Sequence, residues 1–166
     1  MPRFLIIVLL VCGVITTVNA QPEAAASHLR PQHKEAVERW LSGRKPALRI
    51  ATLADCLNKE GLAATREQQG KDYHPYYVVG DFNRDRQEDF AIALINPKKR
   101  SGRFALAIFN GPVGKQSLPA YFTQNWDLSD GGLFDNGGGV MAGPFESDNC
   151  VILHPRGKKY VIKDCL

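Results

Sequence analysis

The chain lacks the short motifs that mark several common classes of enzyme and metalloprotein. It contains no His-Glu-x-x-His, no Gly-x-Ser-x-Gly and no Cys-x-x-Cys sequence, which argues against a zinc protease, a serine-hydrolase elbow and a cysteine-based redox or zinc site. No internal repeat is present, so a propeller or a solenoid is not expected. The charges nearly balance, with 21 Lys and Arg against 17 Asp and Glu, and this balance is not typical of proteins that bind nucleic acid. These patterns predict neither a catalytic residue nor a nucleic-acid partner.

A long apolar run occurs only at the N-terminus, between Phe4 and Val18. It covers about fifteen residues, whereas a membrane-spanning helix needs about twenty. Arg3 precedes the run and the short sequence Val18-Asn19-Ala20 follows it, which is the layout of a cleavable secretory signal peptide. We therefore predict a signal peptide over residues 1–20, a secreted or periplasmic location, and no membrane attachment after cleavage.

Three cysteines would remain after that cleavage: Cys56, Cys150 and Cys165. An exported protein meets an oxidising compartment, which favours disulfides. If Gly157 and Lys158 form a two-residue hairpin turn, Cys150 falls opposite Cys165, at a separation that a disulfide can span. Pairing of Cys56 with the C-terminal strand would close a loop of about a hundred residues and stabilise the fold more. We favour Cys150 with Cys165 and keep a pairing that involves Cys56 as the alternative.

The first part of the mature chain predicts a flexible leader and two short helices. Residues 21–30 are polar and Ala-rich, as loose termini are. Residues 31–42 have helical spacing of apolar residues after Pro31 and are followed by Gly43, which predicts an amphipathic helix. Residues 52–58 are consistent with a second helix capped by Thr52. The polar residues 61–75 are expected to form a loop.

The rest of the chain predicts strands. Residues 76–82, 89–95 and 103–109 are β-rich runs, and the third run is apolar on both faces, so we expect both faces of its sheet to be covered. Residues 127–149 are rich in glycine and are expected to form long loops, whereas residues 150–165 read as a closing hairpin. The prediction is one α+β domain over residues 31–166, with short N-terminal helices packed on an antiparallel β-meander and a C-terminal hairpin.

The segment between the first two predicted strands gathers side-chain oxygens at alternate positions. These belong to Asp81, Asn83, Asp85 and Asp89. Calcium binds about six to eight oxygens, including backbone carbonyls, and here the carbonyl would be that of Gln87. The same alternation would turn Arg84 outward and let Phe82 and Phe90 anchor the two ends of the loop in the core. The pattern predicts a calcium site.

This segment resembles the calcium-loop motif of the FG-GAP and VCBS repeat families, in which Asp-x-Asn/Asp-x-Asp-Gly-x-x-Asp joins two strands of a sheet. The resemblance covers residues 76–95 and implies that Asp81, Asn83, Asp85 and Asp89 are metal ligands. The chain departs from the motif at Arg86, where the motif has Gly; a side chain in left-handed conformation costs about 1 kcal/mol. The alternative is that the same groups only make the side-chain to backbone hydrogen bonds of Asx turns.

The remaining chemistry of the sequence is dispersed. The histidines, at positions 28, 33, 74 and 154, are expected to be scattered surface residues. We therefore predict a non-enzymatic binding protein whose partner is another exported protein. The alternative is a small secreted hydrolase in which carboxylates or His74 line the glycine-rich residues 131–139. A cluster of His74 with Asp81 or Asp89 would favour the hydrolase. An exposed aromatic patch would favour binding, and its candidate residues are Tyr73, Tyr76, Tyr77, Tyr121, Phe122 and Trp126.

Overall fold

The computed structural model describes residues 26–42, 48–114, 116–157 and 159–165. The predicted signal peptide and the first half of the predicted leader lie outside these ranges. Within them the chain forms two α-helices, one short 3-10 helix and two antiparallel sheets. The architecture is therefore α+β, with more strand than helix. No helix in the described ranges combines the length and the apolar character needed to cross a membrane.

The first sheet is built around β3 (Asp89–Ile95) and β4 (Phe104–Phe109), which pair from Phe90 opposite Phe109 to Ile95 opposite Phe104. β5 (Tyr121–Trp126) pairs with the free edge of β4. The opposite edge of β3 is shared by two short strands, since β1 (Arg49–Ile50) pairs with its last two residues and β2 (Tyr77–Gly80) pairs with its first four. β3 is therefore the strand that organises this sheet.

The second sheet is a four-stranded meander. It comprises β6 (Gly131–Asp135), β7 (Val140–Pro144), β8 (Val151–Arg156) and β9 (Lys159–Asp164), each paired with the next along the chain. The backbone N–H of Leu133 in β6 donates to the carbonyl of Pro75, just before β2, at 2.8 Å. This bond joins the two sheets at one side.

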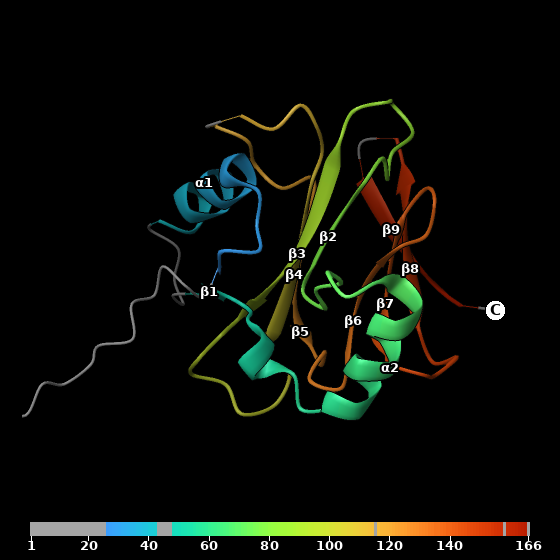
Figure 1. Cartoon of the computed structure of the whole chain (residues 1–166). Coiled ribbons are helices and arrows are strands. Elements are labelled where there is room, and N and C mark those ends of the chain that lie inside the picture. Colours follow the sequence, from blue (N-terminus) through green and yellow to red (C-terminus); the bar gives the residue numbers. More distant parts are fainter. Residues whose placement is uncertain (1–25, 43–47, 115, 158, 166) are drawn as a thin grey trace, which may run out of the picture.

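The central strands of the first sheet are buried on both faces, as the sequence predicts for β4. Phe104, Leu106 and Ile108 face a core cluster that includes residues of the second sheet such as Leu133 and Leu153. The alternate residues of β4 face a second cluster that includes Val37 and Trp40 of α1 (Pro31–Leu41). In Figure 1, α1 and the second sheet accordingly lie on opposite sides of β3 and β4.

The second of the two short helices predicted ahead of the sheet does not form as an α-helix. Residues 52–58 contain only the 3-10 helix η2 (Leu53–Asp55), in which the Asp55 carboxylate accepts the backbone N–H of Thr52 at 2.9 Å. The expected loop over 61–75 instead contains most of α2 (Lys59–Gln69). The side chain of Asn58 caps this helix by accepting the N–H of Gly61 at 2.8 Å, which is a standard N-terminal signal.

The prediction of long loops over residues 127–149 is also wrong, because β6 and β7 lie within them. The glycines of β6 allow neighbouring atoms to approach the backbone closely. A Cβ on Gly131 would lie 2.0 Å from the carbonyl oxygen of Gly143, and one on Gly132 would lie 2.3 Å from the hydroxyl of Tyr73. A larger residue would not fit at these positions. Because the glycines replace the alternating apolar side chains of a typical strand, the sequence does not show the strand.

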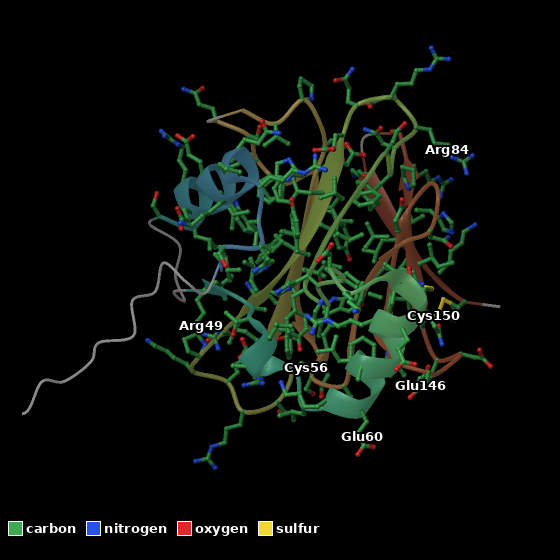
Figure 2. All side chains as sticks on the ribbon, in the orientation of Figure 1. Arg49, Cys56, Glu60, Arg84, Glu146 and Cys150 are labelled. Atoms are coloured by element: carbon green, nitrogen blue, oxygen red, sulfur yellow. A yellow bond between two sulfur atoms is a disulfide. The ribbon has the colours of Figure 1, made fainter. Side chains whose placement is uncertain are left out.

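The disulfide joins Cys150 to Cys165, with 5.3 Å between their Cα atoms. Arg156 pairs with Lys159 across the turn, and Cys165 donates its N–H to the carbonyl of Cys150 at 2.9 Å, so the predicted hairpin register is confirmed. Figure 2 shows Cys150 at the side of the molecule, well separated from Cys56. Cys56 is a free, buried cysteine, and the alternative pairing that involves it does not occur.

The part of the predicted leader that the structure describes is not loose. Ala26 and Leu29 are buried, and they belong to the cluster between α1 and the first sheet. Arg30 forms an ion pair with Glu88, which lies at the end of the loop before β3. Residues 26–30 are therefore packed against the domain.

Candidate functional site: the hairpin loop and the histidine cleft

The predicted calcium loop connects β2 to β3, whose pairing begins at Gly80 and Asp89. The Asp81 carboxylate folds back over the loop: its Oδ1 accepts the N–H of Asp85 at 3.0 Å, and its Oδ2 accepts the N–H of Arg86 at 3.0 Å. The backbone must turn tightly for one carboxylate to accept both of these N–H groups. Arg84 and Arg86 adopt left-handed conformations, with φ of 61° and 68°, so the residue that departs from the glycine of the motif still takes up a glycine-like backbone.

Asn83 and Asp85 complete the loop with short-range bonds. Oδ1 of Asn83 accepts the N–H of Asp85 at 2.9 Å, and Nδ2 of Asn83 donates to Oδ2 of Asp85 at 2.9 Å. Oδ1 of Asp85 accepts the N–H of Gln87 at 2.8 Å. These are the Asx-type bonds that the sequence offered as the alternative to metal ligation.

Asp89 has a different role, because its side chain is fully buried. Its Oδ2 accepts the N–H groups of Phe82 at 2.9 Å and Asn83 at 3.1 Å, and its Oδ1 accepts the N–H of Gly111 at 2.8 Å. Burial raises the pKa of this carboxyl, although the three N–H donors oppose the rise. Asp89 thus fastens both the start of the loop and the segment after β4.

Both ends of the loop are buried, as predicted, but in different clusters: Phe82 belongs to the cluster between the sheets and Phe90 to the cluster under α1. Arg84 is exposed, as predicted, and lies at the periphery of the molecule in Figure 2. Its guanidinium donates to the carbonyl of Gly137 at 3.2 Å. The hairpin loop therefore rests against the turn between β6 and β7.

The predicted ligands do not all converge on one point. Among the described residues, no group of three or more His, Cys, Asp or Glu side chains is placed to hold a metal ion. Asp81, Asn83 and Asp85 lie together through the bonds described above, whereas both oxygens of Asp89 are directed to backbone N–H groups. The fold of the loop is thus accounted for by hydrogen bonds within the chain.

The expectation of scattered surface histidines is wrong for three of the four. His28, His33 and His74 gather around Tyr77 of β2, and His33 is fully buried in α1. Nδ1 of His33 lies 2.7 Å from the hydroxyl of Tyr77, and its ring stacks on Phe90 at 4.1 Å. The sequence carried no local signal for this gathering, because the three residues come from separate elements.

His28 and His74 form a parallel stack. Their ring centroids are 3.4 Å apart and their planes differ by 1°. Nε2 of His28 and Nδ1 of His74 are buried and have no hydrogen-bond partner among the described residues. Burial lowers the pKa of His28 to about 4. Burial, followed by the charges of His28 and Arg66, lowers the pKa of His74 to about 3. Both rings are therefore neutral at pH 7.

The stacked histidines line a cleft of about 400 Å³ between β2 and β6. Its walls include Tyr73 and Phe134, whose rings stack at 5.3 Å, and the carboxylate of Asp135. The cleft thus brings His74 beside the glycine-rich segment, as the hydrolase alternative requires. It does not bring His74 to Asp81 or Asp89, because neither of these carboxylates lines it.

The aromatic residues proposed for a binding patch do not form an exposed surface. Tyr76 is fully buried, and its hydroxyl donates to the carbonyl of Leu128 at 3.1 Å. The other five are half-buried: Tyr73, Tyr77, Tyr121, Phe122 and Trp126. These side chains contribute to the cores and the cleft.

No protein-family model, curated protein or solved structure matches the chain.

Proposed function

We propose that this chain is an exported, non-enzymatic binding protein whose loop 81–89 takes up a calcium ion. The observation that carries the calcium proposal is the inward folding of the Asp81 and Asp85 carboxylates over the loop. An ionised carboxylate oxygen that accepts one N–H keeps a further acceptor position, which a hard cation can occupy. Burial, followed by the charges of Asp89, Asp85 and Asp81, raises the pKa of Tyr160, and the contribution of these charges supports a negative potential at this end of the molecule.

The non-enzymatic role is supported by the buried carboxylates of Asp89 and Asp55, because both make structural contacts within the chain. Asp89 holds three backbone N–H groups, and Asp55 forms a two-point ion pair with Arg49, with distances of 2.7 and 2.6 Å. Both side chains fix loops in place. The Cys150–Cys165 disulfide is compatible with an oxidising compartment. We therefore propose another exported protein as the partner.

The calcium proposal is tested by thermal unfolding of the exported protein, first with EDTA and then with millimolar calcium. A ligand that binds only the folded state raises the melting temperature. We expect a rise that Asp85→Ala abolishes and that Asp148→Ala, which removes an exposed carboxylate in another loop, leaves unchanged. Identical curves for the wild type in EDTA and in calcium would leave the loop a hydrogen-bonded hairpin.

A secreted hydrolase remains the second candidate, because His74 and Asp135 line the same cleft. Chromogenic esters, peptides and glycosides distinguish the two functions. Turnover that both His74→Ala and Asp135→Ala abolish, while Asp148→Ala retains it, would favour the hydrolase. Absence of turnover, together with a stoichiometric complex with one exported protein, would favour the binding role.

A further inference from the structure

The His28–His74 stack connects two segments that are distant in the sequence. His28 belongs to residues 26–30, which precede α1, and His74 belongs to the turn between α2 and β2. The rings of Tyr77 and His28 also meet in a T-shaped arrangement, with centroids 6.0 Å apart. The contact between residues 26–30 and the turn before β2 is therefore made in part by two imidazole rings.

This contact requires both rings to be neutral. An imidazolium carries an N–H on each nitrogen, and each ring has one buried nitrogen without an acceptor among the described residues. Protonation of either ring would bury an unpaired donor and a charge, which is unfavourable. Protonation of both would place two positive charges face to face, at the 3.4 Å separation of the rings.

The charged groups around the stack do not offset the unfavourable free energy of protonating the two rings. Arg66 of α2 lowers the pKa of His74 further, and it donates to the carbonyl of Tyr73 at 3.1 Å. Asp72 and Asp135 line the cleft as exposed residues. On the far side of Tyr77, Arg30 and Glu88 form an ion pair next to His33.

We propose that the His28–His74 stack is an acid-sensitive latch, which holds residues 26–30 against the turn before β2 and releases them when the rings are protonated. Release exposes Ala26 and Leu29, whose side chains are otherwise buried. α1 stays on the sheet through Trp40, whose ring meets those of Phe109 and Phe122. The domain therefore keeps its fold while one apolar segment is freed.

Linkage fixes the direction of the effect. The pKa values of both histidines in the closed state, about 4 and about 3, lie below the ordinary 6.5. The closed state is therefore most stable above pH 6.5 and loses stability as the pH falls toward 4. At pH 4.5, which is two units below the ordinary value, each imidazole favours the open state by about 100-fold.

The test is hydrogen exchange of the full chain at pH 7 and at pH 4.5, corrected for the intrinsic pH dependence of exchange. We expect residues 26–30 to gain exchange by about 100-fold or more, while β3 and β4 keep their protection. The variant His28→Phe with His74→Phe retains two stacked rings that do not titrate, and we expect it to stay protected at pH 4.5. His154→Gln changes a histidine outside the cleft and should behave as the wild type.

Loss of protection at the same pH in the wild type and in the double variant would overturn the latch, since the acid would then act elsewhere. An NMR titration of the wild-type histidines gives a second test that does not depend on the folding of the variant. Titration of His28 and His74 well below 6.5, together with release of residues 26–30, supports the proposal. Titration of both near 6.5 while residues 26–30 stay bound contradicts it.

Discussion

Oδ1 of Asp89 accepts the backbone N–H of Gly111 at 2.8 Å, while Oδ2 of the same carboxylate holds the hairpin loop through Phe82 and Asn83. One side chain thereby joins the segments at the start of β3 and beyond the end of β4. Because the side chain is fully buried, water cannot replace it as an acceptor. Loss of this carboxylate would therefore leave the N–H groups of Phe82, Asn83 and Gly111 without their acceptor.

Replacing Asp89 by Ala should lower the free energy of unfolding by about 3 kcal/mol, because buried N–H donors lose their acceptor. Asp89→Asn keeps one carbonyl oxygen and should lose less. Asp148→Ala, at an exposed position, should change the value by less than about 0.5 kcal/mol. Urea unfolding measures all three, and equal losses for Asp89→Ala and Asp148→Ala would contradict the structural role of Asp89.

Replacing Arg86 by Gly should stabilise the protein, since a side chain with φ of 68° is strained where glycine is not. The gain should reach up to about 1 kcal/mol, less the extra freedom that glycine gives the unfolded chain. Arg100→Gly makes the same change at an exposed turn residue outside the positive-φ set, and it should destabilise by about 0.5 kcal/mol. Denaturant midpoints that fall equally in both variants would refute the strain at Arg86.

Removing the disulfide with Cys150→Ser and Cys165→Ser should cost about 3 kcal/mol in the chain-entropy model, given a sequence separation of 15 residues. Unfolding with and without reductant measures this. The wild type should become less stable in reductant, whereas the double variant should not respond. A response of the double variant would assign the redox effect to another cysteine.

Adding a methyl group at Gly131 should destabilise the second sheet by about 1–3 kcal/mol, because its Cβ would lie 2.0 Å from the carbonyl oxygen of Gly143. Gly114 is the control: a Cβ there would meet no atom within 4 Å, so Gly114→Ala should be neutral or slightly stabilising. A lower melting temperature for Gly114→Ala than for Gly131→Ala would contradict the close approach of β6 and β7.

Strand β4 of the first sheet and the closing hairpin of the second sheet could be predicted from the sequence because their signals are local. The apolar residues of β4 alternate in size along one short run, and the turn between Arg156 and Lys159 sets the register that brings Cys150 to Cys165. Periodicity and turn length are sufficient for such features. The burial of Phe82 and Phe90 followed from the alternation of residues along the loop, whereas their division between two separate clusters did not.

The features that could not be predicted depend on contacts between distant segments. α2 buries only Gly61, Leu62 and Thr65, so its apolar face is too narrow to show as a helical pattern, although the Asn58 cap was a usable signal. β6 contains glycines where strands usually have β-branched residues. The histidine cleft combines residues from three parts of the chain, and no spacing rule relates them.

β1 and β2 share one edge of β3, and this arrangement affects the order in which the chain folds. β3 and β4 are joined by residues 96–103, so this hairpin closes only a short loop and can form early. β1 reaches the same edge only by closing a loop that contains η2, α2 and β2, and loop closure of this kind slows folding. We expect the β3–β4 hairpin to be part of the folding nucleus and the docking of β1 to be among the last steps.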